Sequence, residues 1–188
     1  MTRLDPILDA LTGDFQLVAI DGRGGSGKST LADELATEVG AVVVHGDDFY
    51  RPMSEPDRLL LDAEGGYHRY FDWERLRDQV LIPLSAGRAA RYQRYDWSTG
   101  EVDPVFHEVT ASGVVIVEGC YTARPELERR YGLTVHVDTP SEVCLARLHA
   151  RGHDHGPEDW IGRWAAAEDF YLDSTALRTR AHVVVAGF

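Results

Sequence analysis

Apolar runs of strand length alternate with segments of helical periodicity along most of the chain. The predicted strands cover residues 15–20, 41–44, 114–117, 133–137 and 182–186. Between and around them, apolar residues recur every three or four positions, which predicts helices at 3–12, 29–39, 73–84 and 157–177. Strands that are apolar throughout need cover on both faces, so the alternation predicts an α/β fold with a parallel central sheet.

One stretch departs from this alternation. Residues 91–97 and 102–109 resemble two strands around the turn Ser98-Thr99-Gly100. Such a pattern is typical of a β-hairpin, and we expect a small hairpin insertion at about 89–109. The chain has no internal repeat and no low-complexity linker, and its 188 residues suit a single domain spanning 1–188.

The composition is 44% hydrophobic and 27% charged, as in ordinary globular proteins. The net charge of −12 opposes sequence-independent binding to nucleic acid phosphates. No apolar run approaches the roughly 20 residues of a membrane span. The first residues lack the order of a signal peptide, and the two cysteines, Cys120 and Cys144, form no CxxC motif. These features predict a cytoplasmic protein that binds neither membrane nor nucleic acid.

A glycine-rich segment that ends in a lysine follows the first predicted strand and is a candidate phosphate site. The motif GxxxxGK[ST] is matched by Gly22-Arg23-Gly24-Gly25-Ser26-Gly27-Lys28-Ser29. Its glycines let backbone N–H groups turn inward around phosphate oxygens, and the following helix adds its N-terminal dipole. We expect the nucleotide to contact Gly22, Gly24, Gly25, Ser26, Gly27, Lys28, Ser29 and Thr30. Lys28, the only lysine among 19 basic residues, is expected to reach the β- and γ-phosphates.

An acidic residue at the end of a later strand supports a site for a metal-bound nucleotide. Glu118 follows the apolar strand 114–117, and ligands gather at the carboxyl ends of parallel strands. We expect Ser29 and Glu118 to hold Mg²⁺ bound to ATP, although a strand-end acid could instead cap a helix. The motif and its context predict a three-layer P-loop NTPase fold.

The residues also narrow the class of P-loop protein. GTP-binding switches recognise guanine through a motif that contains an asparagine and a lysine. This chain has no asparagine and its only lysine lies in the P-loop, so the sequence excludes that class. The length fits a kinase of small metabolites. A nucleotide-binding regulatory module that hydrolyses ATP slowly is the alternative from a different class.

Several short motifs resemble those of uridine kinases in the phosphoribulokinase/uridine kinase family. They occur in the family's order and span nearly the whole chain. The matching segments are 47–51 (DDFYR), 71–72 (FD), 95–97 (YDW), 115–119 (VIVEG), 145–151 (LARLHAR) and 180–185 (RAHVVV). The resemblance implies an ATP- and Mg²⁺-dependent transfer of the γ-phosphate to a hydroxyl of a nucleoside.

The resemblance also implies roles for individual residues. Asp47 would accept the proton of the attacking hydroxyl, and Asp72 would hold ribose hydroxyls. Tyr50 would flank the sugar or base, and Arg147 and Arg151 would close over the transferring phosphate as part of a helical lid at about 147–160. Simpler alternatives remain open: a turn acid for Asp47, a helix N-cap for Asp72, and a solvated helix face for the two arginines.

The hairpin departs from the family pattern, because Gly100 stands where a histidine usually meets the nucleobase. Tyr95 and Trp97 could stack on a flat substrate ring or could simply pack the hairpin. The acceptor could therefore also be a vitamin riboside, a pantothenate-like compound or a sugar. Two further features carry no predicted chemistry: His153-Asp154-His155 offers too few ligands for zinc, and Cys120 is read as a packing residue. A homo-oligomer is possible.

Overall fold

The computed structural model describes residues 2–13, 15–152 and 159–187. Five parallel strands form the central sheet in the order β2-β5-β1-β6-β7. Their bounds are β1 Phe15–Asp21, β2 Val42–His45, β5 Gly113–Glu118, β6 Leu133–Asp138 and β7 Val183–Ala186. All five predicted strands are confirmed, each to within one residue or two at its ends.

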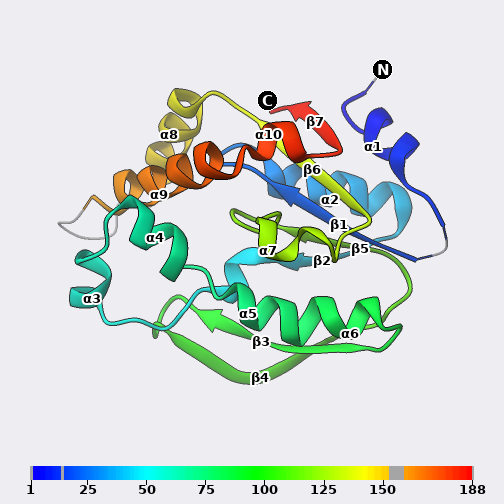
Figure 1. The fold of residues 1–188 in the computed structure, drawn as a ribbon, viewed down its shortest axis with the longest axis horizontal. Coiled ribbons are helices and arrows are strands. Elements are labelled where there is room, and N and C mark those ends of the chain that lie inside the picture. Colours follow the sequence, from blue (N-terminus) through cyan, green and yellow to red (C-terminus); the bar gives the residue numbers. More distant parts are fainter. Residues whose placement is uncertain (1, 14, 153–158, 188) are drawn as a thin grey trace.

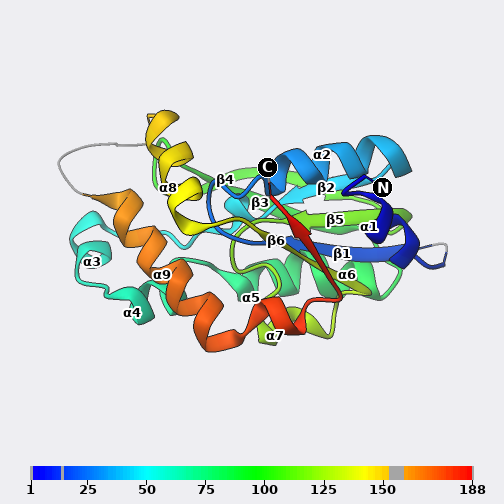
Figure 2. The same cartoon turned by 90° about the horizontal axis from the view of Figure 1, so that it is seen from above.

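Helices cover both faces of the sheet (Figures 1 and 2). One face packs against α1 and α2, and the other packs against α4, α5, α6, α7, α9, α10 and the hairpin. The helices are α1 Asp5–Ala10, α2 Lys28–Val39, α3 Glu55–Leu59, α4 Ala63–Arg69, α5 Trp73–Leu76, α6 Ile82–Ser85, α7 Pro125–Glu128, α8 Ser141–Ala150, α9 Trp160–Thr175 and α10 Leu177–Arg180. The α/β class and its parallel sheet, predicted from the apolar pattern, are thus confirmed.

The two faces are visible in the side chains of the central strand. Val18 and Ile20 of β1 pack with Leu31 and Leu35 of α2. Leu17 and Ala19, which alternate with them along the strand, belong to the core on the opposite face. Because successive strand side chains alternate between faces, a fully apolar strand supplies both cores at once. This packing anchors the segment that continues from β1 into the P-loop.

The predicted hairpin is also confirmed. β3 (Ala90–Asp96) and β4 (Glu101–Val109) pair antiparallel as a separate two-stranded sheet. Gly100 has a positive φ of 76° in the turn, and its N–H donates to the carbonyl of Asp96 at 2.8 Å. Glycine adopts this left-handed backbone conformation without strain, whereas a histidine in the same turn would be strained.

The helix predicted at 73–84 is one continuous helical segment with an irregular middle. A π turn over Arg77–Leu81 links α5 to α6, and Pro83 lies in the first turn of α6. Proline has no N–H to donate and crowds the preceding turn, which explains why regular α-helical bonding is interrupted here.

The apolar pattern predicted no element between residues 51 and 71, where the structure has α3 and α4. Both helices are short and contain proline or glycine, which weakens any periodic signal. Each begins at a side-chain cap: Ser54 accepts the N–H of Asp57 at 3.2 Å, and Asp62 accepts that of Gly65 at 2.8 Å. α4 packs against α9, and α9 in turn borders the site described below.

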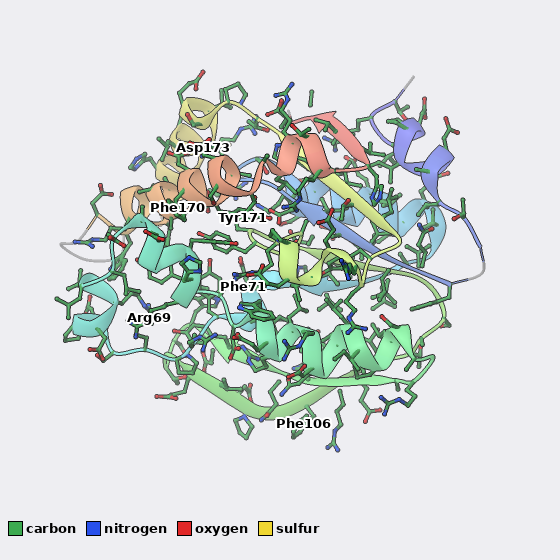
Figure 3. The ribbon with its side chains drawn as sticks, in the orientation of Figure 1. Arg69, Phe71, Phe106, Phe170, Tyr171 and Asp173 are labelled. Atoms are coloured by element: carbon green, nitrogen blue, oxygen red, sulfur yellow. The ribbon has the colours of Figure 1, made fainter. Side chains whose placement is uncertain are left out.

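Aromatic side chains fill the space between α4, α9 and the sheet. Tyr67 stacks on Tyr171 with ring centroids 5.3 Å apart, and Tyr121 meets Tyr171 at 5.1 Å. Figure 3 labels Phe71 and Tyr171 in this interior and Phe106 on the outer side of β4. This aromatic core holds α9 in place beside the P-loop.

Asp21, the last residue of β1, is fully buried beneath the P-loop. Its Oδ2 accepts the N–H of Ala123 at 2.7 Å and the hydroxyl of Tyr171 at 2.8 Å. Burial raises the pKa of this carboxyl to about 6, against the opposing effect of these hydrogen bonds. The side chain thereby joins β1, the segment after β5, and α9.

Replacing Asp21 with alanine is expected to lower the free energy of unfolding by about 2–4 kcal/mol, because three buried donors, the N–H groups of Gly22 and Ala123 and the Tyr171 hydroxyl, lose their acceptor. Urea unfolding at neutral pH measures the effect. Asp78→Ala removes an exposed carboxylate that bonds its neighbour Arg77, and should change stability by less than about 0.5 kcal/mol. Equal unfolding midpoints for the two variants would contradict the joining role of Asp21.

Candidate active site

The P-loop connects β1 to α2 at the carboxyl edge of the sheet. Two of its glycines are required by close approach: a Cβ on Gly22 would lie 2.6 Å from the Val137 carbonyl oxygen, and one on Gly25 would lie 2.6 Å from that of Cys144. Gly27 caps α2 without any side-chain hydrogen bond. The first N–H groups of α2 therefore remain available to an anion, as phosphate binding requires.

Lys28 lies at the start of α2 and is buried in the P-loop. Its Nζ donates to the carbonyl of Arg23 at 2.7 Å. Burial lowers the pKa of the ammonium, but negative groups around it, including Glu168 and Glu118, outweigh that effect and keep the pKa above its ordinary value. The Lys28 side chain therefore stays positively charged, and this charge attracts an anionic phosphate chain.

Ser29 and Glu118 meet beside Lys28. Ser29 Oγ donates to Glu118 Oε2 at 3.1 Å, and Glu118 is only 5% exposed. His45 Nδ1 lies 2.8 Å from Glu118 Oε1. Burial raises the pKa of Glu118, but the His45 hydrogen bond and the charge of Lys28 outweigh it, so the pKa is lowered and the group stays ionised.

These two oxygen donors fit a magnesium ion. Mg²⁺ prefers oxygen ligands and is often bound by one or two carboxylates together with substrate phosphates. Ser29 and Glu118 offer one hydroxyl and one carboxylate beside the phosphate cradle. The expected metal ligands are therefore adjacent, although they come from α2 and β5.

A cavity of about 540 Å³ opens from the P-loop. Residues from distant parts of the chain line it: Gly24, Gly25, Lys28, Ser29, Asp47, Tyr50, Trp97, Glu118, Gly119, Cys120, Leu148, Arg151, Ile161, Trp164 and Glu168. The structure thus brings the expected phosphate residues Gly24, Gly25, Lys28 and Ser29 together with the expected acceptor residues Asp47, Tyr50 and Trp97. The volume of the cavity is within the range of small-molecule binding sites.

Asp47 follows β2 in a 3₁₀ turn at Gly46–Phe49, and its carboxylate is accessible from the cavity. Desolvation within the cleft and the charge of Glu118 raise its pKa to about 6, against the opposing effect of Lys28. A carboxyl with this pKa is ionised at neutral pH and can accept a proton. Asp48, in contrast, points to Arg94, with Nε and Oδ2 3.2 Å apart, and does not line the cavity.

The turn that carries Asp47 is fixed by its neighbours. The guanidinium of Arg75 donates to the carbonyls of Asp48 and Tyr50 at 2.9 and 3.1 Å, and packs over the Phe49 ring. The N–H of Asp72 donates to the Phe49 carbonyl at 2.7 Å. These contacts hold the turn from both sides.

Asp72 itself does not line the cavity. Its Oδ1 accepts the N–H of Arg75 at 3.2 Å and caps α5. The N-cap alternative is therefore what the structure shows, and a hold on ribose hydroxyls stays a prediction. Tyr95 also lies behind the lining: its hydroxyl accepts from Arg58 at 3.1 Å and its ring packs edge-on against Trp97.

The two arginines expected in the lid differ in position. Arg151, at the end of α8, lines the cavity, whereas Arg147 donates to the carbonyl of Gly25 at 3.1 Å and braces the P-loop. The rest of the expected lid is only partly described, since His153-Asp154-His155 lies outside the described residues.

Four of the residues expected to contact the nucleotide do not line the cavity: Gly22, Ser26, Gly27 and Thr30. Gly22 and Ser26 are buried within the P-loop.

Several residues that line or support the cavity were not singled out from the sequence, Trp164, Glu168 and His45 among them. Trp164 and Glu168 come from α9, and His45 supports Glu118. The helical periodicity of 157–177 did not show which of its faces meets the P-loop. His45 stands two residues before Asp47, so its position at a strand end was the only available signal.

The fold and this site together define a P-loop kinase. The chain belongs to the phosphoribulokinase/uridine kinase family, whose model matches residues 17–156. No curated protein matches the sequence. The family resemblance read from the short motifs is thus confirmed, and so is the phosphotransferase class.

Two solved structures are similar over nearly their whole lengths. A possible uridine kinase from Bacillus stearothermophilus superposes with a TM-score of 0.75 at 25% identity, covering 97% of each chain. A protein assigned as a fructose transport system kinase from Silicibacter sp. TM1040 gives a TM-score of 0.70 at 26% identity, covering 98% of each. YFH7 from Saccharomyces cerevisiae shares the fold alone, with a TM-score of 0.64 at 11% identity.

Among the described residues, no helix is both long and apolar enough to span a membrane.

Proposed function

We propose that this protein transfers the γ-phosphate of ATP, in the presence of Mg²⁺, to a hydroxyl of a nucleoside or similar riboside. The observation that carries the proposal is a single cavity shared by the P-loop residues Lys28 and Ser29 and the acid Asp47. A phosphate donor and a hydroxyl acceptor can thus meet in one cavity, as phosphoryl transfer requires.

Each residue has a role that its position supports. Lys28 and the P-loop N–H groups bind and orient the phosphate chain, and Ser29 and Glu118 hold the metal. Bound Mg²⁺ would neutralise charge on the β- and γ-phosphate oxygens. Asp47 orients the attacking hydroxyl and accepts its proton, while Arg151 stabilises charge on the transferring phosphate.

The aromatic lining supports a ring-bearing acceptor. Tyr50 and Trp97 have ring centroids 4.7 Å apart, and Trp164 meets Trp97 edge-on at 6.0 Å. Trp97 is 48% exposed, so part of its surface is free to contact a flat ring. The similarity to a possible uridine kinase supports the same class, while the similarity to a fructose transport system kinase keeps a sugar acceptor as the second candidate.

The test is ADP release from Mg·ATP across a panel of nucleosides, ribosides, pantothenate and sugars. We expect uridine, cytidine or a related riboside to raise the rate at least about tenfold over the acceptor-free rate, because the positioned hydroxyl replaces water as the nucleophile. A rise with fructose alone would move the assignment to a sugar kinase. A rate that no acceptor changes would contradict the kinase proposal and favour a regulatory ATPase module.

A further inference from the structure

Glu168 of α9 is a buried acid with no role so far in the proposed reaction. It lines the cavity and is 8% exposed. Its Oε2 accepts the N–H of Gly24 in the P-loop at 3.0 Å, and its Oε1 accepts the thiol of Cys120 at 3.1 Å. Burial raises the pKa of Glu168, while the charge of Lys28 and the hydrogen bonds from Cys120 and Gly24 oppose that rise. Both hydrogen-bond partners are donors, so they favour the ionised carboxylate and hold it at the border between the phosphate cradle and the acceptor space.

The charge of Glu168 reaches the acceptor residues. Desolvation and Glu118 raise the pKa of Asp47, and Glu168 adds to that rise. Desolvation raises the pKa of Tyr50 as well, with Asp47 and Glu168 contributing. An anionic group on an acceptor in this cavity would meet the same repulsion, since the interaction depends only on charge and distance.

The described lining offers little to offset that repulsion. Its basic side chains are Lys28 and Arg151, both engaged by the phosphate in the proposed reaction. Apart from the apolar side chains of Leu148 and Ile161 and the segment Gly119-Cys120, the acceptor side presents Asp47 and the rings of Tyr50, Trp97 and Trp164. Aromatic faces attract neutral rings and cations but provide no partner for a phosphate or carboxylate.

We infer that Glu168 is a specificity-determining residue that excludes acceptors bearing a phosphate or carboxylate, so that the kinase selects uncharged or cationic hydroxyl acceptors. The inference rests on the proposed function. Glu168 acts through its fixed charge: it neither contacts the reacting hydroxyl nor transfers a proton. The hydrogen bond to Gly24 matters because it prevents the carboxylate from turning away from an anionic acceptor.

The test compares kcat/KM for matched acceptors that differ in charge: pantothenol against pantothenate, and uridine against orotidine. The wild type should favour the neutral member of each pair. Glu168→Gln keeps the size and an acceptor for the Gly24 N–H, and should raise the ratio of anionic to neutral kcat/KM about tenfold, the order expected for one like charge at a partly screened distance. Any change in ATP affinity cancels in this ratio.

Two further variants isolate the charge. Asp173→Asn makes the same change at an exposed position of α9, labelled in Figure 3, and should leave the ratio unchanged. Glu168→Asp keeps the charge and should preserve the wild-type preference even if turnover slows. Stimulation by neutral acceptors with the same ratio in Glu168→Gln and wild type would overturn the specificity role alone. No stimulation by any acceptor would overturn the proposed function and the selectivity with it.

Discussion

Replacing Lys28 with alanine is expected to reduce acceptor-dependent ADP release at least about a thousandfold, the scale on which single phosphate-stabilising groups act in such sites. Lys28 lies among Glu118, Glu168 and Asp21, whose charges favour its protonated form. Without the ammonium, a phosphate chain entering the cradle would face these acids uncompensated. Steady-state ADP release with the best acceptor of the panel measures the loss.

Lys28→Arg sharpens the interpretation because it preserves the charge. Arginine presents a broad planar fork where lysine presents a compact ammonium, and the buried position leaves little room for it. We therefore expect Lys28→Arg to lose most of the activity as well. Near-wild-type turnover in Lys28→Ala would show that the reaction does not use the P-loop charge.

Asp47→Asn is expected to lower kcat at least about a hundredfold, since a positioned general base contributes on that order or more. The amide keeps the size of the side chain but cannot accept the proton of the attacking hydroxyl. Asp48→Asn is the matched control: it removes the neighbouring carboxylate, which pairs with Arg94 outside the cavity. Equal losses in the two variants would assign the effect to the turn rather than to a base.

The pH profile provides an independent readout of Asp47. Its pKa is raised to about 6 by desolvation and Glu118, with Lys28 and His45 opposing and Glu168 adding to the rise. The base form is lost as pH falls through that value, so kcat/KM should decline about tenfold per unit on the acid side of pH 6 and level off above pH 7. Asp47→Asn should lack this acid limb. An unaltered acid limb in the variant would assign it to another group.

The fold was largely predictable because its strands are continuous apolar runs. Residues 15–20 and 114–117 needed no long-range information to be recognised as buried strands, and they became the neighbouring strands β1 and β5. The helices α3 and α4 were missed because short, capped helices depend on single side chains such as Ser54 and Asp62 rather than on periodicity. The order of strands in the sheet also did not follow from the pattern, since pairing is decided by how the helices pack.

The site was predictable where its chemistry lies in consecutive residues. Lys28, Ser29, Asp47 and Glu118 each follow or precede a strand within a short motif, and the structure brings all of them to one cavity. The motifs said less about orientation: Asp72 caps α5 and Arg147 donates to the Gly25 carbonyl, and neither contact is encoded in the short motifs around these residues. The direction of a side chain depends on donors from other elements, and no local spacing encodes these.

The sequence by itself determined the α/β class, the hairpin, the phosphate cradle and the kinase family, because each is carried by neighbouring residues or by a periodic pattern. Only the tertiary structure decided that Trp164 and Glu168 of α9 join the P-loop and Asp47 around one cavity. These residues lie more than a hundred positions from the P-loop, and the packing of α9 on Tyr67 and Asp21 brings them there. Contacts over that distance arise from the packed core, whose geometry is a property of the whole fold.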